Sequence, residues 1–163
     1  MSLDAAQEVS LRIEAPQSAC FAAILEFEHY PDWFSAIESA KILERDKAGV
    51  GRIVEFHIDM RIRRIRYVLE YAYKKPGELS WRSIDGDVES IEGRYSFKKV
   101  SPTITEAACR QEIRLGFWFP GPLRKIAERS ALNQSVSEFK TAVEQRLATA
   151  KRPPTGKKRS PAA

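Results

Sequence analysis

Few residues of this chain combine the type and spacing that catalysis or metal binding requires. The two histidines, His29 and His57, lack the spacing of a metal-binding helix such as His-Glu-x-x-His. There is no Gly-x-Ser-x-Gly elbow, and neither Gly49-x-Gly51 nor residues 154–157 have the glycines of a phosphate-binding loop. We therefore expect no metal, no cofactor and no dedicated catalytic residue.

Phenols and one amide are the remaining groups with acid–base or hydrogen-bonding capacity. A shaped cavity that holds a substrate needs only one or two such groups for acid–base assistance. The same groups could instead only give hydrogen bonds to a ligand or to the core; they are Tyr67, Tyr71, Tyr95 and Gln111.

The two cysteines lie in different kinds of pattern, Cys20 in a helical one and Cys109 in a strand. This favours two buried thiols in a reducing compartment over a disulfide framework. The first 14 residues lack the basic start and apolar core of a signal peptide, and no apolar stretch reaches the length of a membrane span. We therefore expect a cytoplasmic protein.

The net charge of +5 is concentrated at the C-terminus. Five of the 27 basic residues lie in the last 13 residues, and the other 22 balance the 22 acidic residues. We therefore expect an extension over 1–6, one domain over 7–149 and a disordered basic tail over 150–163. The tail is either a solvated terminus or a weak anchor on nucleic acid or anionic membrane, and its basic residues are Lys151, Arg152, Lys157, Lys158 and Arg159.

A second basic feature is the run Arg61-Ile62-Arg63-Arg64-Ile65-Arg66. Four arginines in six residues could bind phosphates. Cross-strand ion pairs on a solvated sheet face also explain them, because the neighbouring strands are rich in acidic residues. The aromatic side chains alternate with the arginines and so belong to the opposite face.

The order of the secondary-structure elements follows from the spacing of apolar residues along the sequence. Alternation of period two predicts a strand over 7–14 and a run of antiparallel strands from 37 to 115, the last from about 103. A helix is expected to begin after Pro16 and to end at Tyr30, because Pro31 disfavours α geometry in the residue before it. A short turn or second small helix follows.

A long C-terminal helix is predicted from about 122 to 148. An apolar stripe runs through Leu132, Val136, Phe139, Val143 and Leu147. A capping-box-like sequence at 135–138 leaves a break near 134 as the alternative. The first half of the helix is more polar than the second, while the sheet opposite carries large aromatic side chains. This favours an apolar cavity beneath the first half, although tight packing would satisfy the same pattern.

Several segments together resemble the polyketide cyclase/dehydrase and lipid-transport branch of the START-like (SRPBCC) superfamily. The resemblance is carried by Phe27-Glu28-His29-Tyr30-Pro31-Asp32-Trp33-Phe34, Gly49-x-Gly51, the Trp81 strand, Gly93-x-Tyr95-x-Phe97 and Thr105. Pro102-Thr103 departs from the family's usual Gly-Thr. The resemblance implies an α+β helix-grip fold, in which a curved seven-stranded antiparallel sheet wraps around a long C-terminal helix and two short helices follow the first strand.

The same resemblance implies binding or transport of a small hydrophobic ligand such as a lipid, quinone or polyketide. Two alternatives remain open. One is a polyketide cyclase/dehydrase-type enzyme, in which the phenols and Gln111 would assist an aldol step, and the other is a module that docks on RNA, a ribosome or an anionic membrane. Phe117, Trp118 and Phe119 are either a cavity gate or a dimer contact. The predicted ligand-binding residues are Trp33, Phe34, Phe56, Ile58, Tyr67, Leu69, Tyr71, Trp81, Tyr95, Phe97, Cys109, Gln111, Ile113, Phe119, Ile126 and Ser130.

Overall fold

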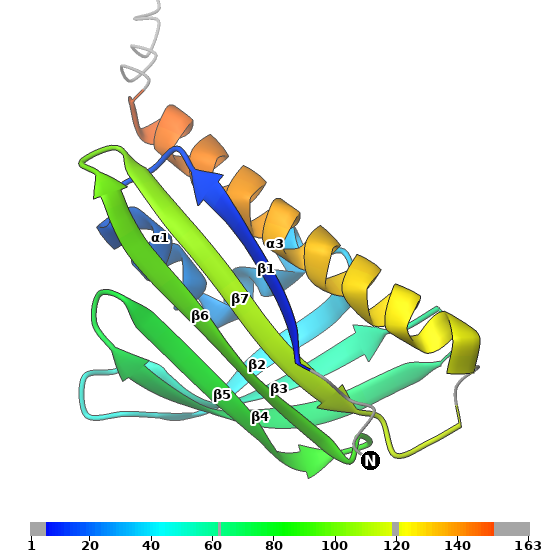
Figure 1. Ribbon diagram of the computed structural model, residues 1–163. Coiled ribbons are helices and arrows are strands. Elements are labelled where there is room, and N and C mark those ends of the chain that lie inside the picture. The colour runs from blue at the N-terminus through cyan, green and yellow to red at the C-terminus, as the bar shows by residue number, and fades with distance from the viewer. Residues whose placement is uncertain (1–5, 62, 119–120, 152–163) are drawn as a thin grey trace, which may run out of the picture.

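A computed structural model describes residues 6–61, 63–118 and 121–151, with the backbone alone for 121–127 and 151. The chain folds as a sheet with helices on one of its faces (Figure 1). The elements are β1 (Gln7–Ile13), α1 (Gln17–Ile24), the 3₁₀ turn η1 (Phe27–His29), α2 (Tyr30–Trp33), β2 (Ile37–Arg45), β3 (Gly51–Asp59), β4 (Arg64–Lys74), β5 (Glu78–Gly86), β6 (Ser90–Ser101), β7 (Ile104–Arg114) and α3 (Gly121–Lys151).

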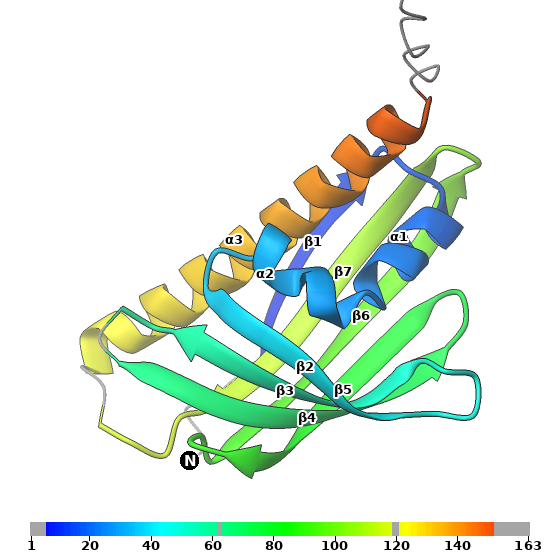
Figure 2. The same cartoon turned by 180° about the vertical axis from the view of Figure 1, so that it is seen from behind.

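The seven strands form one antiparallel sheet in the order β1-β7-β6-β5-β4-β3-β2. The first strand lies beside the last, with Val9 opposite Cys109. Helix α3 lies along the sheet next to β1, and α1, η1 and α2 cover the same face beside it (Figures 1 and 2). This confirms the predicted helix-grip arrangement.

The segment between β1 and β2 differs in detail from the prediction. Helix α1 ends at Ile24, well before Tyr30, and Pro31 lies in the first turn of α2. A missing N–H is harmless at that position, so Pro31 helps to begin a helix. The Tyr30 hydroxyl donates to the Ile24 carbonyl oxygen at 2.5 Å and so satisfies one of the acceptors that the end of α1 leaves free.

Close approaches fix these short helices on the sheet. Phe27 is fully buried, and its ring lies so near Gly51 that a Cβ there would come within 2.8 Å of it. Buried Thr105 on β7 donates its hydroxyl hydrogen to the carbonyl oxygen of Ala15, at 2.7 Å. The glycine and the threonine, both part of the resemblance above, therefore position α1 and η1 against the two halves of the sheet.

Helix α3 is continuous, as predicted, and does not break near residue 134. Ser135, which could have capped a new helix, instead donates to the carbonyl oxygen of Leu132 within the existing one. The predicted stripe is buried at Leu132, Val136, Phe139 and Val143. Of the expected basic tail, residues 152–163 lie outside the described part, as do residues 1–5 of the expected extension.

Arginines on the outer face of the sheet make the expected cross-strand ion pairs. Arg66 contacts Glu55 at 2.8 Å and Asp85 at 3.3 Å, and Arg64 contacts Glu38 at 3.0 Å. The Arg66 guanidinium, hydrogen-bonded to Glu55, holds the pKa of that carboxyl below its usual value. These pairs explain Arg64 and Arg66 without an external partner.

Candidate ligand site on the inner face of the sheet

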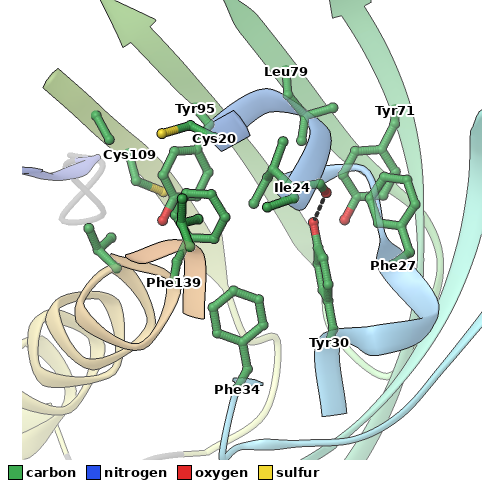
Figure 3. Close-up of a cluster of buried hydrophobic side chains, with 14 of the residues drawn as sticks. Cys20, Ile24, Phe27, Tyr30, Phe34, Tyr71, Leu79, Tyr95, Cys109 and Phe139 are labelled. Atoms are coloured by element: carbon green, nitrogen blue, oxygen red, sulfur yellow. Dashed lines mark hydrogen bonds between the residues drawn. The ribbon is translucent and has the colours of Figure 1, made fainter. Parts of the chain in front are cut away.

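Aromatic rings in a connected series of contacts line the inner face, the face towards the helices, and Figure 3 shows part of this cluster. The rings of Tyr30 and Phe56 stack with centroids 5.9 Å apart, and Phe27 packs on Tyr71 at 4.5 Å. Rings that lie this close and at these angles make favourable contacts beyond simple area burial. The 3₁₀ turn η1 and helix α2 therefore contribute aromatic side chains to the same layer as the strands.

The second half of α3 closes one end of this layer. Phe139 is fully buried, with its ring centroid 5.4 Å from that of Tyr95 and 5.9 Å from that of Phe97. Leu79, Ala107 and Cys109 are buried around them. This end is a packed core, as the apolar stripe of α3 predicted.

Towards the other end, four inner-face side chains are only partly buried, although Ile58, Ile65 and Ile91 beside them are buried. Tyr67, Trp81, Gln111 and Ile113 all fall in this class. Trp81 belongs to the inner face because it lies opposite Tyr71 in the register and its ring is 6.2 Å from the Tyr71 ring. This is the end where β3, β5 and β7 finish and α3 begins, and we call it the open end.

One hydrogen bond crosses the inner face near the open end. Trp81 Nε1 donates to Gln111 Oε1 at 3.2 Å, and the indole passes over Gly93 on the strand between them. A Cβ at Gly93 would lie 2.3 Å from the Trp81 ring, so only glycine leaves room for this arrangement. The glycine is therefore required by close approach and not by a turn.

Two buried phenols lack a hydrogen-bond partner among the described residues, namely Tyr73 Oη and Tyr95 Oη. Tyr95 Oη lies beside the Cys109 thiol (Figure 3), but a thiol is a weak partner and no bond of ordinary geometry forms. Burial raises the pKa of Tyr95 well above its usual value and that of Cys109 to about 12. Both groups are therefore neutral at physiological pH and offer hydrogen bonds rather than a general base or a thiolate.

The structure gathers most of the predicted site residues on the inner face. Fully or nearly buried are Phe34, Phe56, Ile58, Leu69, Tyr71, Tyr95, Phe97 and Cys109. Partly buried are Trp33, Tyr67, Trp81, Gln111 and Ile113. Ser130 is exposed, because it lies two residues, or about 200° of helix, away from the buried Leu132. Phe119 lies outside the described residues, and Ile126 is described by its backbone alone.

The aromatic layer also includes side chains that the sequence did not assign to the site. Phe27 and Tyr30 were interpreted as the end of a helix, yet both pack on strand aromatics. Their aromatic type within the Tyr-Pro-x-Trp segment was the available signal. Trp33 lies partly outside the layer, under the Arg146 guanidinium, which is 4.3 Å from its ring.

Outside the aromatic layer, the two histidines lie beside carboxylates. His29 is hydrogen-bonded to Asp32 at 3.2 Å and His57 lies 3.4 Å from Glu55; both are at the surface. Among the described residues, no cluster of His, Cys, Asp and Glu side chains could hold a metal ion. An open groove of about 770 Å³ lies beside α3, with Trp33 in its lining. Another of about 800 Å³ lies over the outer face of the sheet, with Tyr71 and Trp81 among its lining residues.

The arrangement of sheet and helices defines a helix-grip protein. The chain belongs to the family described as polyketide cyclase / dehydrase and lipid transport, whose model matches residues 13–140. None of the curated proteins is significantly similar to it in sequence. No helix in the described ranges is long and apolar enough to span a membrane.

Solved structures share this fold at low sequence identity. A START superfamily protein from Mycobacterium smegmatis has a TM-score of 0.79 at 19% identity, over 86% of this chain and 98% of that one. The Zhui aromatase/cyclase from Streptomyces sp. R1128 has a TM-score of 0.76 at 16% identity, over 90% and 98%. A protein from Thermus thermophilus reaches 0.74 at 18% identity, over 90% and 99%.

Proposed function

We propose that this protein binds a small apolar molecule on the inner face of the sheet, towards the open end. The observation that carries the proposal is the partial burial of Tyr67, Trp81, Gln111 and Ile113, which face inwards beside a fully packed core. Sites for small molecules are usually concave and apolar, with a few polar groups that fix orientation. Aromatic rings with one amide and neutral phenols provide that combination.

The chemistry of the layer favours a flat or flexible apolar ligand with few polar atoms, such as a lipid, a quinone or a polyketide. None of the predicted site residues carries a charged side chain. Because the phenols stay protonated, they can donate a hydrogen bond to a carbonyl or hydroxyl oxygen of the ligand. The family description, which includes lipid transport, agrees with this ligand class.

The first experiment is native mass spectrometry of the protein purified from its own cells, followed by organic extraction of anything bound. A co-purifying apolar molecule of defined mass supports the proposal. That molecule is then tested for its effect on the melting temperature. Ligand that binds only the folded state raises this temperature by mass action.

A matched pair of variants locates the site. Ile113→Trp enlarges a partly buried side chain of the inner face, and Ile84→Trp enlarges one on β5 that is 47% exposed. We expect Ile113→Trp to abolish the ligand-induced shift and Ile84→Trp to retain it. An equal shift in both variants would place the ligand elsewhere and refute the proposal.

A cyclase is the second candidate, favoured by the family description and by the fold shared with an aromatase/cyclase. In this version, Tyr67 and Gln111 hold the polyketide substrate in a folded conformation while a neutral phenol assists the aldol step. The test is turnover of a polyketide-like substrate and its loss in Tyr67→Phe. Ligand binding without turnover would exclude the cyclase and leave the carrier function as the remaining proposal.

A further inference from the structure

One side chain at the open end is exposed to a degree that the fold does not explain. Trp118, in the connection between β7 and α3, is 84% exposed, whereas the other exposed large apolar residues are 43–48% exposed. Single exposed apolar residues are common on protein surfaces, but a nearly free indole adjoining cationic groups is a characteristic of interfacial anchors. The residues around Trp118 therefore decide what it does.

Arginines from a second loop lie at the same place. The Arg63 guanidinium, in the β3–β4 loop, sits 4.3 Å from the ring centroid of Phe117. This contact joins the two loops beside the start of α3 (Figures 1 and 2). We call Arg61, Arg63, Phe117 and Trp118 the loop tip.

The arginines of the loop tip lack the ion pairs that Arg64 and Arg66 make with acidic residues. Arg61 and Arg63 are exposed, and neither makes an ion pair with another described residue. Asp59, the last residue of β3, precedes this loop, and its carboxylate accepts the backbone N–H of Arg61 at 2.7 Å. Glu89, in the turn between β5 and β6, lies beside Gly116, which precedes Phe117 in the loop tip.

We propose that the loop tip docks on the surface of an anionic phospholipid bilayer. The indole of Trp118 is suited to the level of the lipid headgroups, where its ring is apolar and its N–H stays hydrated. Arg61 and Arg63 are suited to the headgroup phosphates, which planar guanidinium groups bind through paired hydrogen bonds. The attraction of clustered basic residues to an anionic leaflet supplies the remaining driving force.

Other occupants fit the loop tip less well. A nucleic acid strand would need a basic path beyond the tip, but the arginines of the adjoining outer face are paired with Glu38, Glu55 and Asp85. A second copy would bring Arg61 and Arg63 against the same like-charged groups if the contact were symmetric. A bilayer satisfies both the apolar and the cationic parts of the tip at once.

Docking would also bring the open end of the inner face to the membrane. This last point rests on the proposed ligand-binding function, whereas membrane docking does not. An apolar ligand could then pass between bilayer and protein without crossing water. The two proposals fail separately, because vesicle binding can be measured on protein without ligand.

The experiment is co-sedimentation of the full chain with two kinds of vesicle, phosphatidylcholine alone and an equal mixture with phosphatidylglycerol. We expect binding to the mixed vesicles and much less to the neutral ones. Arg63→Gln should weaken binding about fivefold, because one basic residue near an anionic membrane surface contributes about that factor to the affinity. Trp118→Ser should weaken it by about tenfold or more, since a tryptophan side chain can bury on the order of 200 Å² of surface.

Matched variants control for general effects of charge and apolar surface. Arg94→Gln removes an exposed arginine from the middle of β6, and Leu43→Ser removes a side chain, 48% exposed, near the far end of β2. Both should bind like the unchanged protein, and Trp118→Phe should retain most of the affinity. Absence of binding to mixed vesicles, or undiminished binding by Trp118→Ser and Arg63→Gln, would overturn the proposal. Concentration-dependent dimers that disappear in Trp118→Ser, without vesicle binding, would do the same.

Discussion

The indole of Trp81 and the amide of Gln111 are joined by a 3.2 Å hydrogen bond that spans three strands of the sheet. The two residues lie on β5 and β7, and each is opposite Gly93 on β6. A side chain on the middle strand would occupy the space of the indole. The bond therefore depends on a residue that takes no part in it, which makes Gly93 the natural place to test the arrangement.

Gly93→Ala should destabilise the fold, because the new Cβ would lie 2.3 Å from the Trp81 ring. Overpacking of this kind typically costs about 1–3 kcal/mol of unfolding free energy. Urea denaturation measures the change. Gly77→Ala is the control, since a Cβ there meets its nearest atom at 3.6 Å. Equal losses in the two variants would contradict the close approach over Gly93.

Tyr30→Phe should lower the free energy of unfolding, whereas Tyr95→Phe should not. Tyr95 Oη is buried without a partner, so its removal should be neutral or slightly stabilising. Tyr30 Oη donates to the Ile24 carbonyl oxygen, and losing that bond should cost about 0.5–1.5 kcal/mol. Chemical denaturation of both variants under the same conditions checks the difference. A larger loss for Tyr95→Phe would mean that its hydroxyl has a partner after all.

Raising the pH should destabilise the protein before it ionises the inner tyrosines. Burial raises the pKa values of Tyr30, Tyr71 and Tyr95 well above 10, while the unfolded chain loses these protons near pH 10. The folded state therefore binds more protons in this range, so its stability falls as the pH rises above about 10. Denaturation at increasing pH should show this, with near-ultraviolet phenolate absorbance rising together with unfolding. Full phenolate absorbance in a protein with unchanged circular dichroism would contradict the burial of these rings.

Phe139→Ala should cost about 3–5 kcal/mol, because the side chain is fully buried against Tyr95 and Phe97. Leu43→Ala, at a side chain that is 48% exposed, should change the unfolding free energy by well under half of that. The comparison of denaturation midpoints, with slopes verified as equal, gives the result. A small effect at Phe139 would indicate that the second half of α3 is loosely packed.

The strands and the long helix were predictable because their patterns are periodic over many residues. Val54, Phe56 and Ile58 alternate along β3, and the structure buries all three. The region around Tyr30 was not predictable in the same way. Tyr30 has φ −55° and ψ −38°, an α conformation that the following proline usually disfavours. Its hydrogen bond to Ile24 is a tertiary contact that no local rule contains.

The candidate site was predictable in residue type but not in detail. Aromatic side chains on alternate positions, such as Tyr67 and Tyr71, indicate an apolar face. The cross-strand row of Trp81, Gly93 and Gln111 depends on register across three strands, which sequence spacing leaves open. Trp118 belongs to a connection without periodicity, so its exposure follows only from the structure.

The pairing of β1 with β7 has a consequence for how the chain is made. Ile13 lies opposite Thr105 and Gln7 opposite Gln111. The first strand therefore cannot pair until its partner strand, about 100 residues further along the chain, has been synthesised. At ribosomal speeds of about 5–20 residues per second, that interval is about 5–20 s. During it Val9, Leu11 and Ile13 have no final partner strand, and the nascent chain presents an unpaired apolar strand to its surroundings. The amino-terminal strand is thus the segment on which chaperones have the longest opportunity to act before the sheet is complete.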